Sequence, residues 1–338
     1  MILITGGAGF IGSHTAVALL NAGYEIGILD NLSNSKYESI RRIKQLTEKE
    51  CPFFEIDLLD YLALDRIFCE NKIDSVIHFA GFKAVGESVS KPLEYYHNNI
   101  TGTLNLCRIM REHNVKKLVF SSSATVYGLA KVVPVTEDMP ISATNPYGST
   151  KLMIENILND LFVSDNDWSI ALLRYFNPIG AHKSGILGEN PNGIPNNLMP
   201  RICNVVNGKM DKLTIWGTDY ATHDGTGVRD YIHVLDLADG HIAALNKCNK
   251  DKGIFTYNLG TGIGYSVFDL INTFARVNNV NIPYDVCPRR PGDVASLYAD
   301  CSKAEKEMSW KAKLGLEDMC ADSYKFVKKN PKGYEDSK

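Results

Sequence analysis

The sequence lacks the features that mark disulfide-rich, metal-binding and membrane-spanning proteins. Its eight cysteines are scattered over 338 residues and form no CxxC pair, so free thiols in a reducing cytoplasm are expected. Its eight histidines show no HExxH or similar ligand spacing, and we predict no metal site. His78 lies in an apolar segment, which favours a core histidine. No apolar run is long enough to span a bilayer, and the first residues predict a strand rather than a signal peptide.

The sequence also has little excess charge. The net charge is -3 and no basic stripe stands out, so neither a nucleic acid nor a membrane surface is predicted as a partner. Hydrophobic residues make up 44% of the chain, as in an ordinary globular protein. There is no internal repeat, and the polar tail from Lys328 is expected to fray.

The N-terminal half alternates short apolar runs with longer amphipathic segments. The expected strands are Ile2–Thr5, Glu25–Leu29, Phe53–Ile56, Ser75–Phe79, Lys117–Ser121 and Ser169–Arg174. The expected helices are Ser13–Asn21, Tyr61–Asn71, Asn99–His113 and Tyr147–Leu161. This alternation predicts an α/β protein with a Rossmann-type, doubly wound parallel sheet and its ligand at the carboxyl ends of the strands.

A glycine-rich turn follows the first expected strand. Residues 7–12, GAGFIG, satisfy GxGxxG, and Gly6 extends the motif. Glycine is needed there because a Cβ would block the tight turn and the approach of a pyrophosphate to the helix N-terminus. The motif alone is weak, but a strand before it and a helix after it make a dinucleotide site the better interpretation.

Asp30 ends the second expected strand, close to the spacing of about 20 residues at which a ribose-binding acid is found. Its charge would repel a 2′-phosphate, which favours NAD over NADP. Lys36, Arg41 and Arg42 lie downstream, but none adjoins the strand end. Asp57, after the third strand, is either an adenine contact or a plain loop carboxylate.

A second motif, Tyr147-Gly148-Ser149-Thr150-Lys151, is YxxxK at the start of a helix. Its tyrosine and lysine share one helical face, so the ammonium is expected to lower the pKa of the phenol from near ~10 toward neutrality. Such a phenolate can remove a hydroxyl proton while a nicotinamide takes the hydride. The alternative is a surface helix, but the serines at 121–123 end a strand upstream and supply a hydroxyl for the same substrate oxygen.

These motifs do not stand alone. TGGAGFIGSH, HFAGFKAVGES, FSSSATVYG, NPYGSTK, LRYFNPIGAH, GIPNNLMP, DGTGVRDYIHV and PRRPGD together resemble the extended short-chain dehydrogenase/reductase family, and within it the UDP-galactose 4-epimerases. The resemblance covers nearly the whole chain. It implies a tightly held NAD, a UDP-sugar as the substrate, and usually a homodimer built from a helix pair of each subunit.

The resemblance also implies roles for individual residues. The catalytic residues would be Ser123, Tyr147 and Lys151. Those binding the cofactor would be Gly6, Gly9, Phe10, Ile11, Gly12, Asp30, Asn31, Asp57, Leu58, Phe79, Ala80, Lys83, Asn98, Ser121, Tyr147, Lys151 and Tyr175. Those binding the substrate would be Lys83, Ser123, Tyr147, Asn177, Asn197, Leu198, Arg229, Tyr231, Arg290, Asp293 and Leu297.

We expect two lobes on this basis. Residues 1–176, with 224–250 returning to them, would form the NAD-binding Rossmann domain. Residues 177–223 and 251–338 would form a smaller, mixed α/β lobe that binds the UDP-sugar.

The strand end after the serines separates two reactions on this fold. Dehydratases resemble Ser-Thr-Asp-Glu there, whereas this chain has Ser123-Ala124-Thr125 and lacks both carboxyl groups. A UDP-hexose 4-epimerase that interconverts UDP-galactose and UDP-glucose through a 4-keto sugar is therefore favoured. The alternatives are an NAD-dependent nucleotide-sugar oxidoreductase and, last, a nucleotide-sensing regulator.

Leu297 bears on substrate breadth. Some family members carry a tyrosine there, and a bulky ring is associated with rejecting 2-acetamido sugars. We hypothesise that UDP-GalNAc and UDP-GlcNAc are also accepted, unless the neighbouring Tyr298 compensates.

Overall fold

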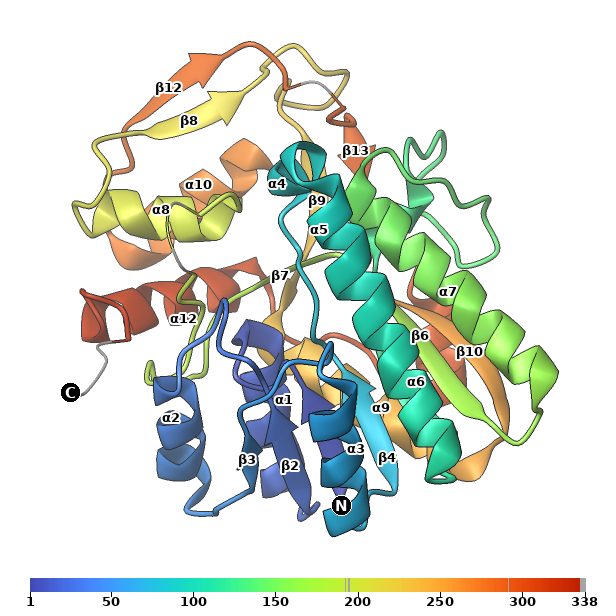
Figure 1. The fold of residues 1–338 in the computed structure, drawn as a ribbon. Coiled ribbons are helices and arrows are strands. Elements are labelled where there is room, and N and C mark those ends of the chain that lie inside the picture. Colours follow the sequence, from blue (N-terminus) through green and yellow to red (C-terminus); the bar gives the residue numbers. More distant parts are fainter. Residues whose placement is uncertain (192, 194, 291, 335–338) are drawn as a thin grey trace.

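The computed structural model describes residues 1–191, 193, 195–290 and 292–334. Within these ranges no helix combines the length and the apolar character needed to cross a membrane. Seven parallel strands form one sheet in the spatial order β10-β6-β5-β4-β1-β2-β3 (Figure 1). They are β1 (Ile2–Thr5), β2 (Ile26–Leu29), β3 (Phe53–Phe54), β4 (Ser75–His78), β5 (Lys117–Ser123), β6 (Ser169–Tyr175) and β10 (Gly253–Leu259). The predicted doubly wound sheet is confirmed.

Helices cover both faces of this sheet, because successive strand residues point to opposite sides. In β1, Ile2 and Ile4 belong to one hydrophobic cluster and Leu3 belongs to the other. The first face carries α1 (Phe10–Asn21), α2 (Glu38–Thr47) and α9 (Val234–Lys250). The second carries α3 (Tyr61–Glu70), α6 (Gly102–Glu112) and α7 (Pro146–Ser164). Short turns of helix, α4 (Val85–Ser90), α5 (Pro92–Tyr96), a π-turn (His97–Thr101) and a 3₁₀ turn (Ala124–Tyr127), complete this part.

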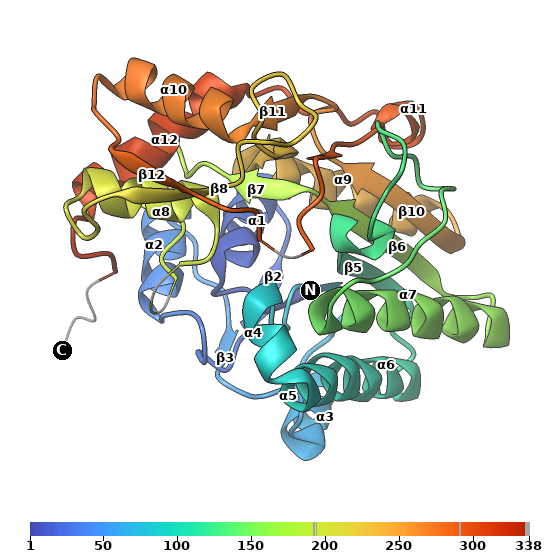
Figure 2. The ribbon, with the colours of Figure 1, turned by 90° about the horizontal axis from the view of Figure 1, so that it is seen from above.

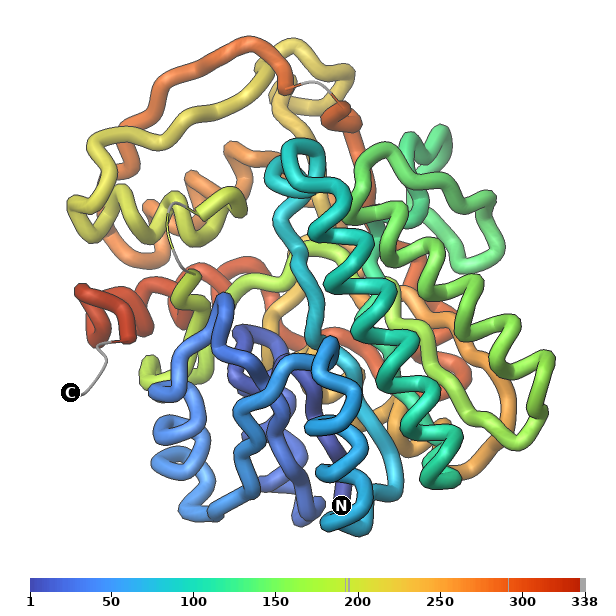
Figure 3. Tube along the Cα trace, in the orientation of Figure 1, coloured from blue at the N-terminus to red at the C-terminus, as the bar shows by residue number. Residues whose placement is uncertain are grey.

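A third hydrophobic cluster forms the core of a smaller lobe beside the sheet (Figure 2). Its helices are α8 (Leu198–Val206), α10 (Val267–Asn278) and α12 (Leu316–Lys329). Its strands are β7 (Asn177–Ile179), β8 (Leu213–Trp216), β9 (Val228–His233), β11 (Gly264–Ser266), β12 (Tyr284–Cys287) and β13 (Ser296–Leu297). A further helix, α11 (Ser302–Met308), packs against β10, so the chain crosses between the two parts more than once (Figure 3).

Two expectations need correction. The sequence predicts that residues 251–338 belong to the smaller lobe, but β10, within this range, pairs along its whole length with β6 and extends the large sheet. The same division places 224–250 with the large sheet, but only α9 packs on that sheet, whereas β9 pairs with β7, β11 and β13 of the smaller lobe. The tail was expected to fray from Lys328, but α12 continues to Lys329 and Tyr334 is buried. The aromatic ring of Tyr334 packs against Phe326, and this contact offsets the entropy that the polar segment loses when it is ordered. The rest of the two-lobe division remains a prediction.

His78 is a buried core residue, as predicted. Its two ring nitrogens lie 2.7 Å from Thr5 Oγ1 and 2.9 Å from Thr103 Oγ1. Burial lowers the pKa of His78 to about 3, so the ring is neutral at physiological pH. Its hydrogen bonds therefore join β1, β4 and α6 without a buried charge.

A buried ion pair fastens α7 to the sheet. Arg174 of β6 donates from Nε and Nη2 to the two carboxylate oxygens of Glu155, at 3.0 and 2.7 Å. The Ser122 hydroxyl donates to the same carboxylate at 2.5 Å, and Arg174 also donates to the Tyr127 hydroxyl. Both charged side chains are almost fully buried, so each depends on the other to satisfy its hydrogen-bonding groups.

We predict that Arg174→Met lowers the free energy of unfolding by about 3–5 kcal/mol, because Glu155 would stay buried without its partner. The double variant Arg174→Met/Glu155→Met should recover most of that loss. Urea unfolding followed by circular dichroism measures both. A single variant as stable as the native chain would contradict the importance of the pair.

Candidate active site

The predicted site residues all line one cleft at the carboxyl ends of the large sheet, with a volume of about 820 Å³. The cofactor side is lined by Gly6, Gly9, Phe10, Ile11, Gly12, Asp30, Asn31, Asp57, Leu58, Phe79, Ala80, Lys83, Asn98, Ser121 and Tyr175. The middle is lined by Ser123, Tyr147 and Lys151. The side of the smaller lobe is lined by Asn177, Asn197, Leu198, Arg229, Tyr231, Arg290, Asp293 and Leu297. Sequence positions far apart thus converge on one cavity, although their individual roles remain predictions.

The glycine turn leaves no room for side chains. A Cβ on Gly12 would lie 2.4 Å from the carbonyl oxygen of Gly6, and one on Gly6 would lie 2.6 Å from the amide nitrogen of Ala80. Gly6 also has a positive φ of 69°. Among the described residues, no side chain caps the start of α1, and uncapped amides at a helix N-terminus suit an anion such as a pyrophosphate. These features fit the dinucleotide that the sequence predicts.

The Asp30 carboxylate is held in place by three donors. It accepts hydrogen bonds from the amides of Ala8 and Leu32, at 3.0 and 2.9 Å, and from the Ser35 hydroxyl at 2.7 Å. Asn31 donates to Asp57 at 2.8 Å, which joins the ends of β2 and β3. A fixed carboxylate at this edge suits the hydroxyls of an adenosine ribose.

The basic residues downstream do not offer a second phosphate site. Arg41 and Arg42 both pair with Glu38, and neither lines the cleft. Lys36 lines the cleft but donates to the backbone oxygen of Tyr334 at 3.0 Å. The arrangement supports the preference for NAD.

Helix α7, which carries Tyr147 and Lys151, begins next to the end of β5. Asn145 caps it by accepting a hydrogen bond from the Gly148 amide at 2.9 Å, and Pro146 occupies the first turn. Lys151 is buried, donates to the Ser121 carbonyl at 2.7 Å, and places its Nζ 5.9 Å from the centre of the Tyr147 ring. Ser123, Tyr147 and Lys151 therefore lie together as the motif predicts.

The pKa of the tyrosine differs from the expectation. Burial raises the pKa of Tyr147, and a hydrogen bond with Ser123 opposes this shift only in part. Burial lowers the pKa of Lys151 to about 8, while the nearby Glu155 opposes that shift. The predicted lowering of the Tyr147 pKa by Lys151 is therefore not found in the chain alone, because burial raises this pKa by more than the hydrogen bond with Ser123 lowers it.

The loop that carries Lys83 is fixed by Asn99, which the sequence did not indicate. The Asn99 side chain accepts a hydrogen bond from the Phe82 amide at 2.7 Å and donates one to the Phe82 carbonyl at 3.0 Å. It also donates to Thr150 of α7 at 3.1 Å. Lys83 itself lies 3.4 Å from Glu189 across the cleft.

Two arginines in the smaller lobe converge on one carboxylate. Arg290 Nε lies 3.1 Å from Asp293, and Arg229 Nη2 lies 3.9 Å from its other oxygen. The buried Asp230 accepts hydrogen bonds from the amides of Thr261, Gly262 and Ala299, which fixes β9 below them. Guanidinium groups held side by side in this way suit a diphosphate.

Leu297 and Tyr298 face different surroundings. Leu297 is half-buried, pairs in register with Arg229 and lines the cleft. Tyr298 is not among the described residues that line it, and its ring lies against Gly264. The alternative in which Tyr298 compensates for the short side chain is therefore not supported.

The strand end after β5 carries no carboxyl group. Ser123, Ala124 and Thr125 all line the cleft, and the Ser123 hydroxyl accepts the Thr125 amide at 3.2 Å. The acidic residues among the described lining positions are Asp30, Asp57, Glu189 and Asp293. None of them lies at the end of β5, so an acid–base pair for eliminating water is not assembled there.

The sequence missed further lining residues of the smaller lobe. They include Glu189, Arg201, Thr214, Ile215, Trp216 and Tyr220. Arg201 lies one helical turn after Asn197, and its Nε is buried without a hydrogen-bond partner in the described part of the chain. The 197–201 spacing is a signal that could have been used, but strand β8 carries no motif. Ile194 and Pro291, in two of the quoted motifs, lie outside the described residues.

Two groups of side chains away from the cleft have the geometry to hold an ion. They are Asp65, Cys69 and His113, and His223, Asp224 and Asp269. The expectation of no metal site remains a prediction.

Comparisons with known proteins agree with this geometry. A family model described as GDP-mannose 4,6-dehydratase matches residues 3–323. The UDP-glucose 4-epimerase of Bacillus subtilis is 60% identical over 99% of this chain and 98% of its own length. The crystal structure of the Bifidobacterium longum UDP-glucose 4-epimerase, in complex with NAD⁺ and UDP, is 54% identical with a TM-score of 0.95, over 98% and 99% of the two chains.

A third similar protein is the UDP-Glc/GlcNAc 4-epimerase of Campylobacter jejuni, 38% identical with a TM-score of 0.85 over 97% of this chain and 99% of that one. The family model is described by a dehydratase, but the similar proteins named above are all 4-epimerases. This agrees with the lack of carboxyl groups at Ser123, Ala124 and Thr125. This chain therefore belongs to the extended short-chain dehydrogenase/reductase family, and within it to the UDP-glucose 4-epimerases.

Proposed function

We propose that this chain interconverts UDP-glucose and UDP-galactose with a retained NAD. The observation that carries the proposal is the meeting of Ser123, Tyr147 and Lys151 in a cleft that joins a dinucleotide cradle to a pair of arginines. The full-length similarity to UDP-glucose 4-epimerases supports the same reaction. A substrate with a diphosphate fits the arginine side, and its sugar would then lie near the middle of the cleft.

The chain's own groups account for the proton transfer. Tyr147 would accept the proton of the C4 hydroxyl and return it, with the Ser123 hydroxyl bonded to the same oxygen. Bound NAD would supply a reversible hydride acceptor for C4, and its positive charge would oppose the rise in the Tyr147 pKa that burial causes. Lys151 would hold the nicotinamide ribose from its place beside Ser121.

Inversion requires that the sugar turn while its nucleotide stays bound. Oxidation at C4 gives a flat 4-keto centre, and reduction of the other face of that centre inverts it. Arg229 and Arg290, already ordered around Asp293, would hold the diphosphate during the turn. An oxidoreductase on the same fold would consume added cofactor, whereas this cycle has no net redox change.

The purified protein should convert UDP-galactose without added NAD, because the cofactor is regenerated in each cycle. Proton NMR would follow the two sugars, and absorbance at the NADH maximum should show no accumulation. If the sugar reacts only when NAD is supplied in an amount equal to the sugar, the oxidoreductase alternative is correct.

Tyr147→Phe is the matched variant for this assay, since it removes only the hydroxyl. We expect kcat to fall by about 10²–10⁴-fold with the NAD content unchanged, because the acid–base group is lost. A variant that keeps most of the native rate would refute the assignment.

We also propose that the pocket accepts UDP-GalNAc and UDP-GlcNAc. Leu297 supports this because its short side chain lines the cleft, while Tyr298 lies against Gly264. The Campylobacter jejuni protein, which is described as acting on both sugar types, gives a precedent among similar chains.

Leu297→Tyr should lower kcat/KM for UDP-GalNAc about tenfold or more, because the ring would occupy the space of the acetamido group. UDP-galactose should be converted at nearly the native rate. Tyr298→Leu serves as the control and should leave the ratio of the two substrates unchanged. If the native chain does not convert UDP-GalNAc, the proposal of breadth fails.

We propose a homodimer that forms through α5, α6 and α7, helices on one face of the large sheet. Leu93 of α5, Leu104 of α6 and Met153 of α7 are all exposed, and α5 packs against α7. Figure 2 shows α5, α6 and α7 together at one side of the molecule. Exposed apolar side chains on three helices at the same side of the molecule favour association with a second copy.

Leu104→Glu should convert a dimer into a monomer, because a charge would be buried in the interface. Analytical ultracentrifugation measures this, with Val132→Glu as a control at an exposed position outside these helices. A native chain that sediments as a monomer would refute the proposal.

A reducing compartment such as the cytoplasm is proposed for this protein. All eight cysteines are free thiols, including four that are buried. Burial raises the pKa of the Cys51 thiol to about 11, which keeps it protonated and unreactive.

A further inference from the structure

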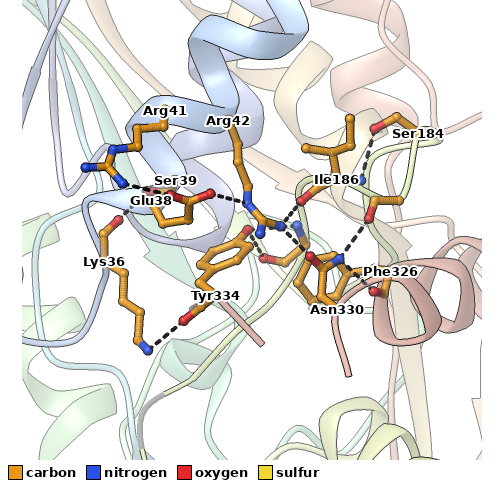
Figure 4. Close-up of polar contacts among 12 residues, drawn as sticks. Lys36, Glu38, Ser39, Arg41, Arg42, Ser184, Ile186, Phe326, Asn330 and Tyr334 are labelled. Atoms are coloured by element: carbon orange, nitrogen blue, oxygen red, sulfur yellow. Dashed lines mark hydrogen bonds and ion pairs between the residues drawn. The ribbon is translucent and has the colours of Figure 1, made fainter. Parts of the chain in front are cut away.

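The C-terminal segment reaches back to the cofactor side of the cleft. Arg42 of α2, Asn330 and Tyr334 make a group of contacts that we call the C-terminal clasp (Figure 4). The Arg42 guanidinium stacks over the Tyr334 ring at 4.3 Å. It also donates to Asn330 at 2.6 Å and to the Ile186 carbonyl at 2.5 Å.

One end of the clasp holds the loop before α2. The backbone oxygen of Tyr334 accepts a hydrogen bond from Lys36 at 3.0 Å. Lys36 and Ser35 line the cleft, and Ser35 donates to the Asp30 carboxylate at 2.7 Å. The loop that completes the predicted adenosine side is therefore tied to the last described residue of the chain.

The other end of the clasp holds the loop at 185–190. The Tyr334 hydroxyl accepts from the Gly188 amide at 3.0 Å and donates to the Gly188 carbonyl at 2.9 Å. Asn330 donates to the Gly185 carbonyl at 2.9 Å. Gly188 and Glu189 line the cleft, and Glu189 reaches Lys83 across it at 3.4 Å, so this loop borders the cleft from the side of the smaller lobe.

The Tyr334 side chain is suited to both bonds. It is 5% exposed and belongs to the hydrophobic cluster on the α1 face of the sheet. Burial raises its pKa to about 12, so the hydroxyl stays neutral and can both donate and accept. Buried bonds of this kind are stronger than exposed ones, because water does not compete for the same groups.

We infer that Tyr334 and Arg42 are positioning residues that slow the release of NAD by joining the loop before α2, on the cofactor side of the cleft, to the loop at 185–190. For these two loops to move apart and open the cleft, their contacts with the C-terminal segment would have to break first. The inference rests on the proposed function only in taking NAD as the bound dinucleotide. Neither residue touches the reacting atoms, so the chemical step should be unaffected once the site is filled.

The test compares the native chain with Tyr334→Phe, which removes the two hydrogen bonds with Gly188 and keeps the ring. Arg42→Met is a second variant that cuts the polar contacts of the guanidinium and keeps an unbranched stem. Tyr24→Phe is the control, because it deletes a hydroxyl bond to the exposed Asn246 far from the clasp. Each protein is passed through gel filtration and diluted into an NAD-degrading enzyme, and the NAD still bound is measured over time.

We expect both clasp variants to lose NAD about tenfold faster than the native chain, and the control to match the native chain. Saturating added NAD should restore kcat to the native value, which a merely misfolded variant would not allow. Thermal unfolding identifies a variant that has lost its fold, and Tyr334→Phe then carries the test alone.

Native dissociation rates in Tyr334→Phe and in every folded clasp variant would overturn the inference and leave the epimerase proposal intact. A native chain that neither retains NAD nor converts UDP-galactose would refute the proposed function instead.

Discussion

The buried pair of Arg174 and Glu155 fixes the position of α7, the helix that carries Tyr147 and Lys151. Arg174 lies on β6 and Glu155 lies one turn after Lys151 on α7, so the pair sets the distance between that helix and the sheet. Ser122 donates to the same carboxylate, which fixes the end of β5 next to Ser123. The geometry of Ser123, Tyr147 and Lys151 thus depends on charges that never face the cleft.

The two sides of the cleft are built by different means. The cofactor side relies on backbone: Gly6 and Gly12 let the turn close, and the amides of Ala8 and Leu32 hold Asp30. The side of the smaller lobe relies on long charged side chains, Arg229 and Arg290, gathered around Asp293. A rigid cradle suits a cofactor that stays bound, and adaptable side chains suit a substrate that must enter, turn and leave.

The clasp extends the same division to the end of the chain. The composition of the last residues predicts a polar, frayed tail, yet Tyr334 packs against Phe326 and Arg42. Its contacts reach two loops that line the cleft, the one at 35–36 and the one at 185–190. A segment remote from the chemistry therefore belongs to the same structural unit as the glycine turn.

The sequence by itself determined the features that depend on local pattern. They are the turn at Gly6–Gly12, the acid at Asp30, the YxxxK helix and the lack of carboxyl groups after Ser123. Each is read from particular residue types at a fixed spacing. Tertiary structure alone decided the rest. It placed β10 in the large sheet, buried Tyr334, brought Arg201 and β8 to the cleft, and raised the pKa of Tyr147 where the motif had predicted a lower one. The reason is that pairing, burial and desolvation depend on residues distant in the chain, which no local spacing records.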